Sequence, residues 1–155
     1  FRGLKPEAFE ADLQINFISL VKVIQAVLPN LTAGEQTSIV LFSSVAASMG
    51  MPFHTSVAAA KGAIEGFAKA LAAEYAPKIR INVIAPSLTD TPLADKFLNN
   101  ETKQEKSAER HPLKRFGKPE DSAQMATFLL SDKSSWISGQ IFHVDGGMST
   151  LLVNG

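Results

Sequence analysis

Apolar residues recur near the start of the chain with the spacing of a helix. The positions that repeat every three or four residues are Phe9, Leu13, Phe17, Leu20, Ile24 and Leu28. Further apolar residues stand between them, so the predicted helix is apolar on more than one face and is buried on more than one side. Its start is indicated by Pro6 followed by an acidic residue, and its end by Pro29 and Asn30. The pattern predicts a helix over 7–28.

Three short apolar runs, rich in β-branched residues and followed by polar loops, predict parallel strands. These strands are expected at 39–42, 79–85 and 140–144. Helical patterns at 56–75 and 119–130 separate them, whereas the charged residues 92–118 predict short helices and loops on the surface. Alternation of helices and strands is typical of a parallel sheet covered by helices. The prediction is a single α/β domain over 1–155, with the strand at 39–42 in its interior.

Composition narrows the classes of function. Apolar residues make up 45% of the chain and charged residues 19%, with fifteen basic and fifteen acidic side chains. This balance gives no electrostatic footprint for nucleic acid. The chain has no cysteine, and its three histidines lack metal-ligand spacing, so we expect no metal site. No apolar run reaches the ~20 residues of a membrane helix, and no signal peptide is visible, so we predict no membrane partner and a cytoplasmic location.

Hydroxyl groups gather where the predicted strands end. Ser43 and Ser44 follow the first strand, and the segment 86–91 follows the second. Ligands of open α/β sheets bind beyond the carboxyl ends of the strands. Lys61 lies early in the helix that begins near the same edge, so Ser44 and Lys61 can face one crevice. A hydroxyl can hydrogen-bond a carbonyl oxygen, and an ammonium can bind a ribose hydroxyl. A capping serine and a solvated lysine are the alternative interpretation.

Along nearly its whole length the chain resembles the short-chain dehydrogenase/reductase family. The stretches that carry the likeness are LQINFISLVKVIQAVLP, SIVLFSSVAASMG, AAAKGAIEGFAKALAAEYAPKIRINVIAP, PSLTDTPL, RFGKPED and SGQIFHVDGG. The resemblance implies the C-terminal part of a Rossmann-type, doubly wound parallel sheet, with about three strands. It also implies an oxidoreductase that transfers hydride between NAD or NADP and a carbonyl or alcohol substrate.

The resemblance assigns roles to residues of this sequence. Ser44 would orient the substrate carbonyl, Lys61 would hold the nicotinamide ribose, and Asn16 would help to hold a water linked to Lys61. The segment 92–118 would include the substrate lid. The residues expected to border the nicotinamide, with Thr91 near its carboxamide, are Pro86, Ser87, Thr89 and Thr91.

The sequence departs from the family pattern at the acid/base position. The family has a tyrosine four residues before the lysine, and Val57 stands there. One branch places the tyrosine seven residues before the lysine, and His54 stands there. Histidine exchanges protons near neutral pH, but a loop histidine in water is the favoured interpretation. Tyr75 lies ~20 Å beyond Lys61 at 1.5 Å per helical residue. Ser87 replaces a family glycine.

The glycine loop that holds the cofactor phosphates in the family has no counterpart in this sequence. We therefore expect a preceding segment or a covering partner, because the strand at 39–42 would otherwise be an exposed sheet edge. The helices 7–28 and 56–75 carry surplus apolar surface, which predicts a homo-dimer or homo-tetramer. Two functions stay open: an oxidoreductase, and a pseudoenzyme that binds a nucleotide or a protein without hydride transfer.

Overall fold

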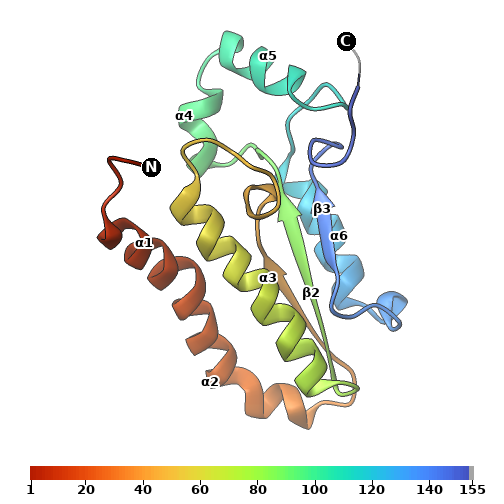
Figure 1. The fold of residues 1–155 in the computed structure, drawn as a ribbon. Coiled ribbons are helices and arrows are strands. Elements are labelled where there is room, and N and C mark those ends of the chain that lie inside the picture. Colours follow the sequence, from red (N-terminus) through yellow and green to blue (C-terminus); the bar gives the residue numbers. More distant parts are fainter. Residues whose placement is uncertain (154–155) are drawn as a thin grey trace.

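The computed structural model describes residues 1–153, and its centre is a parallel sheet of three strands in the order β1-β2-β3 (Figure 1). The strands are β1 (Thr37–Phe42), β2 (Ile79–Pro86) and β3 (Ile141–Val144). All three predicted strands are confirmed, with ends that differ by one or two residues. The Rossmann-type parallel arrangement expected from the sequence is also confirmed.

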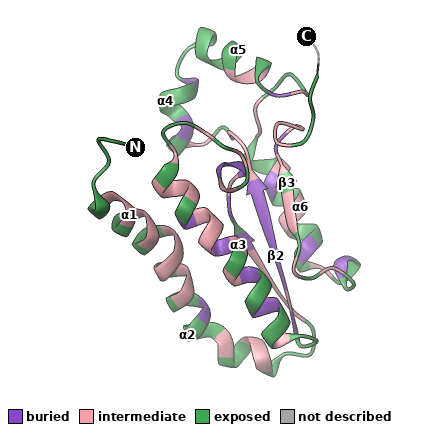
Figure 2. Cartoon of the chain, in the orientation of Figure 1, coloured by how far each residue is buried: buried purple, intermediate pink, exposed green. Residues whose placement is uncertain are grey.

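Within the described residues the first strand lies at the edge of the sheet, which is the position expected for it when no preceding segment or partner covers it. β1 pairs only with β2, so β1 is an edge strand and β2 is the central one. Six of the eight residues of β2 are buried, whereas β1 is mostly half-buried and ends at the exposed Phe42 (Figure 2). An apolar run reports burial of the strand faces and does not report how many neighbours the strand pairs with.

Helices α3 (Thr55–Tyr75) and α6 (Pro119–Leu130) cover the two faces of the sheet (Figure 1). The buried side chains of α3 form one stripe: Ala60, Ile64, Ala68, Leu71 and Ala72. Because several of these residues are alanines, the helix backbone can approach the strands closely. Its stripe meets Ile79, Ile81 and Val83 of β2 in the main core cluster. This packing fixes the start of α3 near the carboxyl edge of the sheet.

The first helical segment lies along α3 and is longer than predicted. It comprises α1 (Pro6–Leu13), a π-helical turn (Gln14–Ile18) and α2 (Ser19–Ala33). The predicted end at Pro29 is wrong, because the helix continues through this proline. Proline removes one backbone donor, but the hydroxyl of Thr32 donates to the carbonyls of Leu28 and Pro29, at 3.0 Å each, and so supports the last turn.

By length and composition alone, Pro6–Ala33 is a weak candidate for a membrane span. Polar residues interrupt the apolar runs of this segment, so the short runs expected from the sequence and this window of high mean hydropathy are both present. Core helices of globular domains pass the same test. Here Phe17 meets Phe67 of α3 edge to face, with ring centroids 5.6 Å apart.

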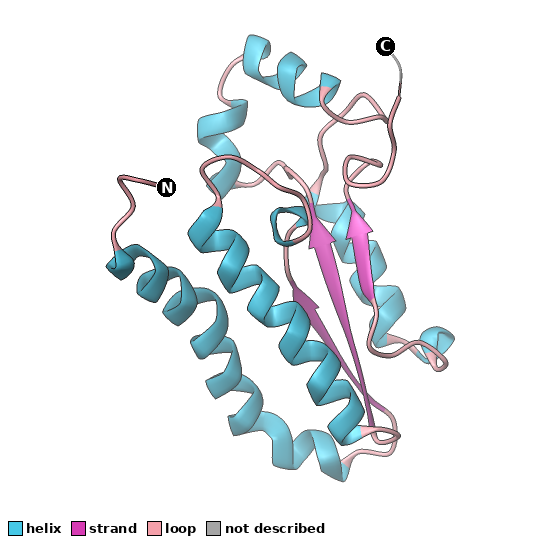
Figure 3. Ribbon diagram, viewed as in Figure 1, coloured by secondary structure: helices cyan, strands magenta, loops and turns pink. Residues whose placement is uncertain are grey.

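A segment of short helices lies over the carboxyl edge of the sheet (Figure 3). It contains a short 3-10 helix (Pro92–Ala94), α4 (Asp95–Leu98) and α5 (Glu101–Glu109). This agrees with the short helices and loops predicted for 92–118. Only Ala94 and Leu98 of these three helices are buried, so the segment contributes little to the core and mainly shapes the space above the sheet.

Candidate active site

The polar loops after the three strands meet at one edge, as predicted. Pairing of Phe42 with Ile84 and of Pro86 with Val144 aligns the strand ends. The backbone N–H of Ser43 donates to the carbonyl of Ile84 at 2.8 Å, which extends this alignment into the first loop. The hydroxyl residues of the first two loops therefore stand beside each other, where a ligand of an α/β sheet binds.

The two adjacent serines have different environments. Ser43 is buried, and its hydroxyl donates to Glu65 Oε1 at 2.7 Å. Ser44 is half-buried, and its Oγ accepts the backbone N–H of Ala46 at 3.2 Å, which caps a short 3-10 helix. This bond uses a lone pair of Ser44 and leaves its O–H free to donate. Of the two serines, Ser44 is therefore the one whose hydroxyl is free to donate to a ligand.

Lys61 lies on the second turn of α3 and reaches the end of β1. Its Nζ donates to the carbonyl of Phe42 at 3.2 Å, two residues before Ser44. Burial lowers the pKa of the Lys61 ammonium from its ordinary value. An ammonium has three N–H donors, so two remain after the bond to Phe42. Lys61 is thus a half-buried cation at the carboxyl edge with donors to spare.

Asn16 lies in the π-helical turn, next to the residue that packs on α3. Its Nδ2 donates to the carbonyl of Asp12 at 3.0 Å, which orients the amide along its own helix. The hydrogen bonds of residues 1–153 do not join Asn16 to Ser44 or Lys61. π-helical turns are frequent at functional sites, and this turn has no signal in the apolar periodicity.

Val57 lies on the first turn of α3 and is half-buried. His54 precedes this helix, and its Nδ1 lies 2.7 Å from the carbonyl of Pro52. A carbonyl only accepts, so Nδ1 carries the hydrogen and Nε2 is the nitrogen left for other partners. Tyr75 ends the same helix, so it is remote from Lys61 as predicted.

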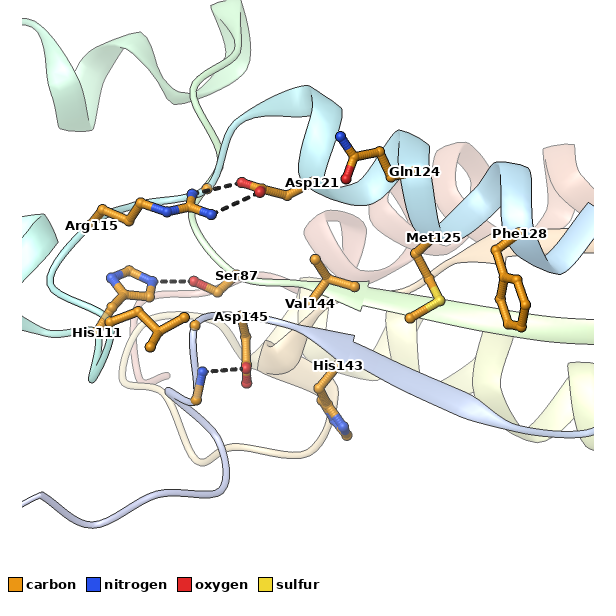
Figure 4. A pocket seen from close by; sticks show the side chains of 14 residues that line it. Ser87, His111, Arg115, Asp121, Gln124, Met125, Phe128, His143, Val144 and Asp145 are labelled. Carbon is orange, nitrogen blue, oxygen red and sulfur yellow. Dashed lines mark hydrogen bonds and ion pairs between the residues drawn. The ribbon is translucent and has the colours of Figure 1, made fainter.

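The loop after β2 holds a serine–histidine pair that the sequence interpretation missed. The Ser87 hydroxyl is hydrogen-bonded to His111 Nε2 (Figure 4), and His111 Nδ1 lies 2.7 Å from the carbonyl of Ser107. Because the carbonyl of Ser107 can only accept, Nδ1 of His111 carries the ring hydrogen, and Nε2 accepts from the Ser87 hydroxyl. His111 is only 3% exposed. No local signal links these residues, since the chain travels through the short helices between them.

The other predicted cofactor-binding hydroxyls are oriented by their own loop. Thr89 Oγ1 donates to the carbonyl of Ser87 at 3.0 Å, and Thr91 Oγ1 donates to the carbonyl of Thr89 at 3.4 Å. Gly117 pairs with Thr89 in an isolated bridge, which ties this loop to the start of the α6 region. The two hydroxyls keep free lone pairs and can still accept hydrogen bonds from a ligand.

The turn after β3 is rigid and acidic. Asp145 is buried and accepts the backbone N–H groups of Gly147 and Ser149, at 2.9 Å each. Burial raises the pKa of this carboxyl, but the hydrogen bonds from Ser149 and Gly147 outweigh it, and the net shift is downward. Gly147 has a φ of +84°, a conformation that favours glycine.

Two cavities flank the carboxyl edge. The first, of about 300 Å³, lies beneath α4 and α5; its walls are Val45, Met51, His54, Leu88, Lys96, Phe97, Lys103, Lys106, Ser107, Arg110, His111 and Met148. The second, of about 570 Å³, lies between α6 and the end of β3 and includes Ser87, Met125, Val144 and Asp145 (Figure 4). His111 borders both cavities. Residues 1–153 contain no cluster of three potential metal ligands.

Known proteins are similar to this chain in sequence and in fold. The family model described as Enoyl-(Acyl carrier protein) reductase matches residues 1–149. The 3-oxoacyl-(acyl-carrier-protein) reductase FabG of Thermotoga maritima is 39% identical over 146 residues, which are 94% of this chain and 58% of that protein. A protein of Xanthobacter autotrophicus named inactive 2-(S)-hydroxypropyl-CoM dehydrogenase 2 is 35% identical over 144 residues, which are 90% of this chain and 63% of that protein.

A solved structure shows the same arrangement of elements. The gluconate 5-dehydrogenase from Burkholderia cenocepacia J2315, in complex with NADP and tartrate, matches with a TM-score of 0.90 and 27% identity. The match covers 97% of this chain and 60% of that protein. The chain thus spans less than two thirds of the length of these relatives. Since the family model covers nearly every residue and the parallel sheet agrees, the chain belongs to the short-chain dehydrogenase/reductase family.

Proposed function

We propose that this chain supplies the nicotinamide half of an active site that transfers hydride between NAD or NADP and a carbonyl or alcohol substrate. The observation that carries the proposal is the arrangement at the end of β1. There, Ser44 has a free hydroxyl and Lys61 has two uncommitted N–H donors, and Val45, next to Ser44, lines a cavity of about 300 Å³. The cofactor of one structural relative, NADP, is in keeping with this assignment.

The residues at this edge fit a nicotinamide riboside. Lys61 would donate to the ribose hydroxyls, and the hydroxyls of Thr89 and Thr91 keep lone pairs for a carboxamide. Pro86 and Ser87 would form the wall of the ring site, with the Ser87 side chain held by His111. The nicotinamide, when bound, supplies or accepts the hydride. Ser44 would donate to the substrate oxygen and stabilise the charge that develops there.

The proton needs a source other than residue 57. Reduction of a carbonyl adds a hydride to carbon and a proton to oxygen, and the Val57 side chain has no proton to give. His54 lies on the cavity wall with its Nδ1–H held by the carbonyl of Pro52, so Nε2 would take up a proton from solvent and then give this proton to the alkoxide. Asn16 would assist, as the resemblance implies, through a water that connects Lys61 to solvent.

A second function is favoured by Val57 itself. A family member without an acid can keep the cofactor site and lose turnover, and would then serve as a nucleotide-binding or protein-binding module. One relative at 35% identity is named inactive, so loss of activity occurs among proteins similar to this chain. Retention of Ser44 and Lys61 then reflects descent.

Oxidation of NADH and of NADPH with a panel of carbonyl compounds separates the two functions. The variants are Ser44→Ala, His54→Gln and Val57→Tyr, with Ser135→Ala as a control, because Ser135 is an exposed serine on a distant loop. Turnover that is lost in Ser44→Ala and reduced in His54→Gln supports the oxidoreductase. No wild-type turnover, together with turnover in Val57→Tyr, supports the pseudoenzyme and refutes the role of His54.

We also propose a homo-dimer or homo-tetramer that buries the outer face of the first helical segment. Ile15, Val23 and Val27 are 70%, 60% and 43% exposed, and an apolar helix face of this kind is typical of an interface. Val23→Glu is expected to lower the mass observed by sedimentation at micromolar concentration, whereas Gln25→Glu, at an exposed polar residue of the same helix, changes the charge by the same single unit and is the control. A monomeric wild-type protein would contradict the proposal. A cytoplasmic location likewise stays a prediction.

A further inference from the structure

The cavity beneath α4 and α5 is lined by cations on one side. Lys96, Lys103, Lys106 and Arg110 are among its twelve lining residues, and no aspartate or glutamate is. The whole chain has a net formal charge of zero, so this local excess does not follow from a basic composition. A cavity bordered by one sign of charge concentrates ligands of the opposite sign.

Helix α5 separates its charges between two faces. Lys103, Lys106 and Arg110 follow one another at three- and four-residue spacing and border the cavity. The acidic residues 101, 105 and 109 repeat every four residues, and none of them borders the cavity. Residues three or four apart share a helix face, so the positive face of α5 is turned to the cavity and the negative face is turned elsewhere.

The cations differ in how far they are already engaged. Lys103 Nζ donates to the carbonyl of Lys96 and to Asn99 Oδ1, at 2.9 Å each, so it mainly supports the end of α4. Lys96 lies over the ring of Phe97, 4.9 Å from its centroid. The single ion pair among residues 1–153 joins two residues outside this cavity, so Lys106 and Arg110 have no carboxylate partner. These two side chains are the ones available to a ligand.

The opposite wall of the cavity is apolar and adjoins the proposed reaction centre. Val45, next to Ser44, lies on this wall together with Met51, Leu88 and Met148. His54 also lines this cavity. A ligand that fits both walls has an uncharged body near Ser44 and an anionic group near α5. The volume of about 300 Å³ is at the small end of ligand sites, which indicates a compact molecule.

We propose that this cavity binds the substrate, and that the substrate is a small carbonyl or alcohol compound bearing a carboxylate or phosphate group held by Lys106 and Arg110. The inference rests on the proposed function for the position of the reacting carbon. Arginine binds either oxyanion through two parallel N–H donors, and lysine adds a point charge. The anionic group would anchor the molecule at α5 and leave its carbonyl end at Ser44.

Isothermal titration with malonate, inorganic phosphate and the uncharged malonamide tests the site without hydride transfer. Malonate or phosphate is expected to bind, and malonamide is not. Lys106→Gln and Arg110→Gln should each weaken binding by about tenfold or more, as expected when a charge-assisted hydrogen bond is lost. Lys133→Gln, an exposed lysine on the loop after α6, is the matched control and should bind as wild type does. Tighter binding of malonate identifies a carboxylate, and tighter binding of phosphate identifies a phosphate.

Three outcomes overturn the proposal: no binding of either anion, equal binding of malonamide, or unchanged affinity in both α5 variants. A thermal melt of each variant verifies that these exposed substitutions leave the fold intact. Anion binding without turnover supports the cavity assignment and counts against hydride transfer. Turnover of neutral carbonyls that is unaffected by Lys106→Gln and Arg110→Gln supports hydride transfer and refutes the anionic substrate.

Discussion

Arg80 of β2 joins three elements, and its removal should destabilise the fold strongly. Its guanidinium donates to the carbonyls of Leu129 and Ser131 at the end of α6, at 3.1 Å each, and to the hydroxyl of Ser134 at 2.9 Å. A cation at a helix C-terminus also interacts favourably with the helix dipole. Arg80 therefore fixes α6 to the sheet, although it forms no ion pair among the described residues.

The magnitude follows from these three bonds, because a fourth, to the carbonyl of Ile137, is long at 3.4 Å. Each hydrogen bond from a charged donor contributes about 1.5–3 kcal/mol, but the bonds share one guanidinium, and the carbonyl of Leu129 keeps the hydroxyls of Ser38 and Ser134 as donors. We expect Arg80→Ala to lower the free energy of unfolding by about 2–4 kcal/mol. A domain is typically stable by about 5–15 kcal/mol, so the variant should fold but unfold at a clearly lower urea concentration. The free energy of unfolding of Arg80→Lys should lie between those of wild type and Arg80→Ala. A lysine ammonium keeps the charge but lacks the planar fork of donors that reaches two separate carbonyls.

Urea unfolding followed by circular dichroism measures these changes. Lys78→Ala is the control, because Lys78 is an exposed basic residue just before the same strand. If the free energies of unfolding of Arg80→Ala and Lys78→Ala differ by less than about 0.5 kcal/mol, the effect of Arg80→Ala is no larger than that of an ordinary surface substitution. Such a result would show that the guanidinium bonds do not hold α6 to the sheet, and would refute the reasoning.

Three further substitutions test other contacts. Ile81→Ala, at a side chain that is 0% exposed, should lower the free energy of unfolding by about 2–5 kcal/mol; a loss under 1 kcal/mol in urea would contradict the core assignment. Ser87→Ala should lower it by about 1 kcal/mol by leaving His111 Nε2 without its donor, and an unchanged urea midpoint would refute this. The Arg115 guanidinium lowers the pKa of Asp121 from 3.8 to about 2, so this carboxylate adds stability above pH 3.8 that is lost as the pH falls through about 2. The difference in melting temperature between wild type and Asp121→Asn should thus be small, because the pair is exposed, and should vanish near pH 2; a difference that grows on acidification would have the wrong sign.

Residues that start or cap a helix allowed its bounds to be predicted from the sequence where their own hydrogen bonds set the helix end. The helix predicted at 119–130 is present with the same bounds, because Pro119 suits a first turn and Asp121 accepts the backbone N–H of Lys118 at 2.7 Å. The rule failed at Pro29, where a threonine hydroxyl supports the final turn and the helix continues. A proline excludes one hydrogen bond and does not by itself decide where a helix ends.

Contacts between distant segments could not be read from the sequence. The resemblance identified Ser44 and Lys61, and the structure brings both to the end of β1. The bond between Ser87 and His111 and the positive wall formed by α5 depend on how the short helices lie over the sheet. A charge-segregated pattern is visible in residues 101–110, but the direction in which each face points is a property of the fold.

The π-helical turn at Gln14–Ile18 gives the first helical segment one residue more than an unbroken α-helix would place over the same length. Ile15, 70% exposed, stands within it. If the same residues formed an unbroken α-helix without this turn, everything upstream would be rotated by about 100° about the helix axis, since an α-helix has 3.6 residues per turn. Phe9 and Leu13 would then leave the side facing α3. The extra residue acts as a phase correction between the two halves of the helix.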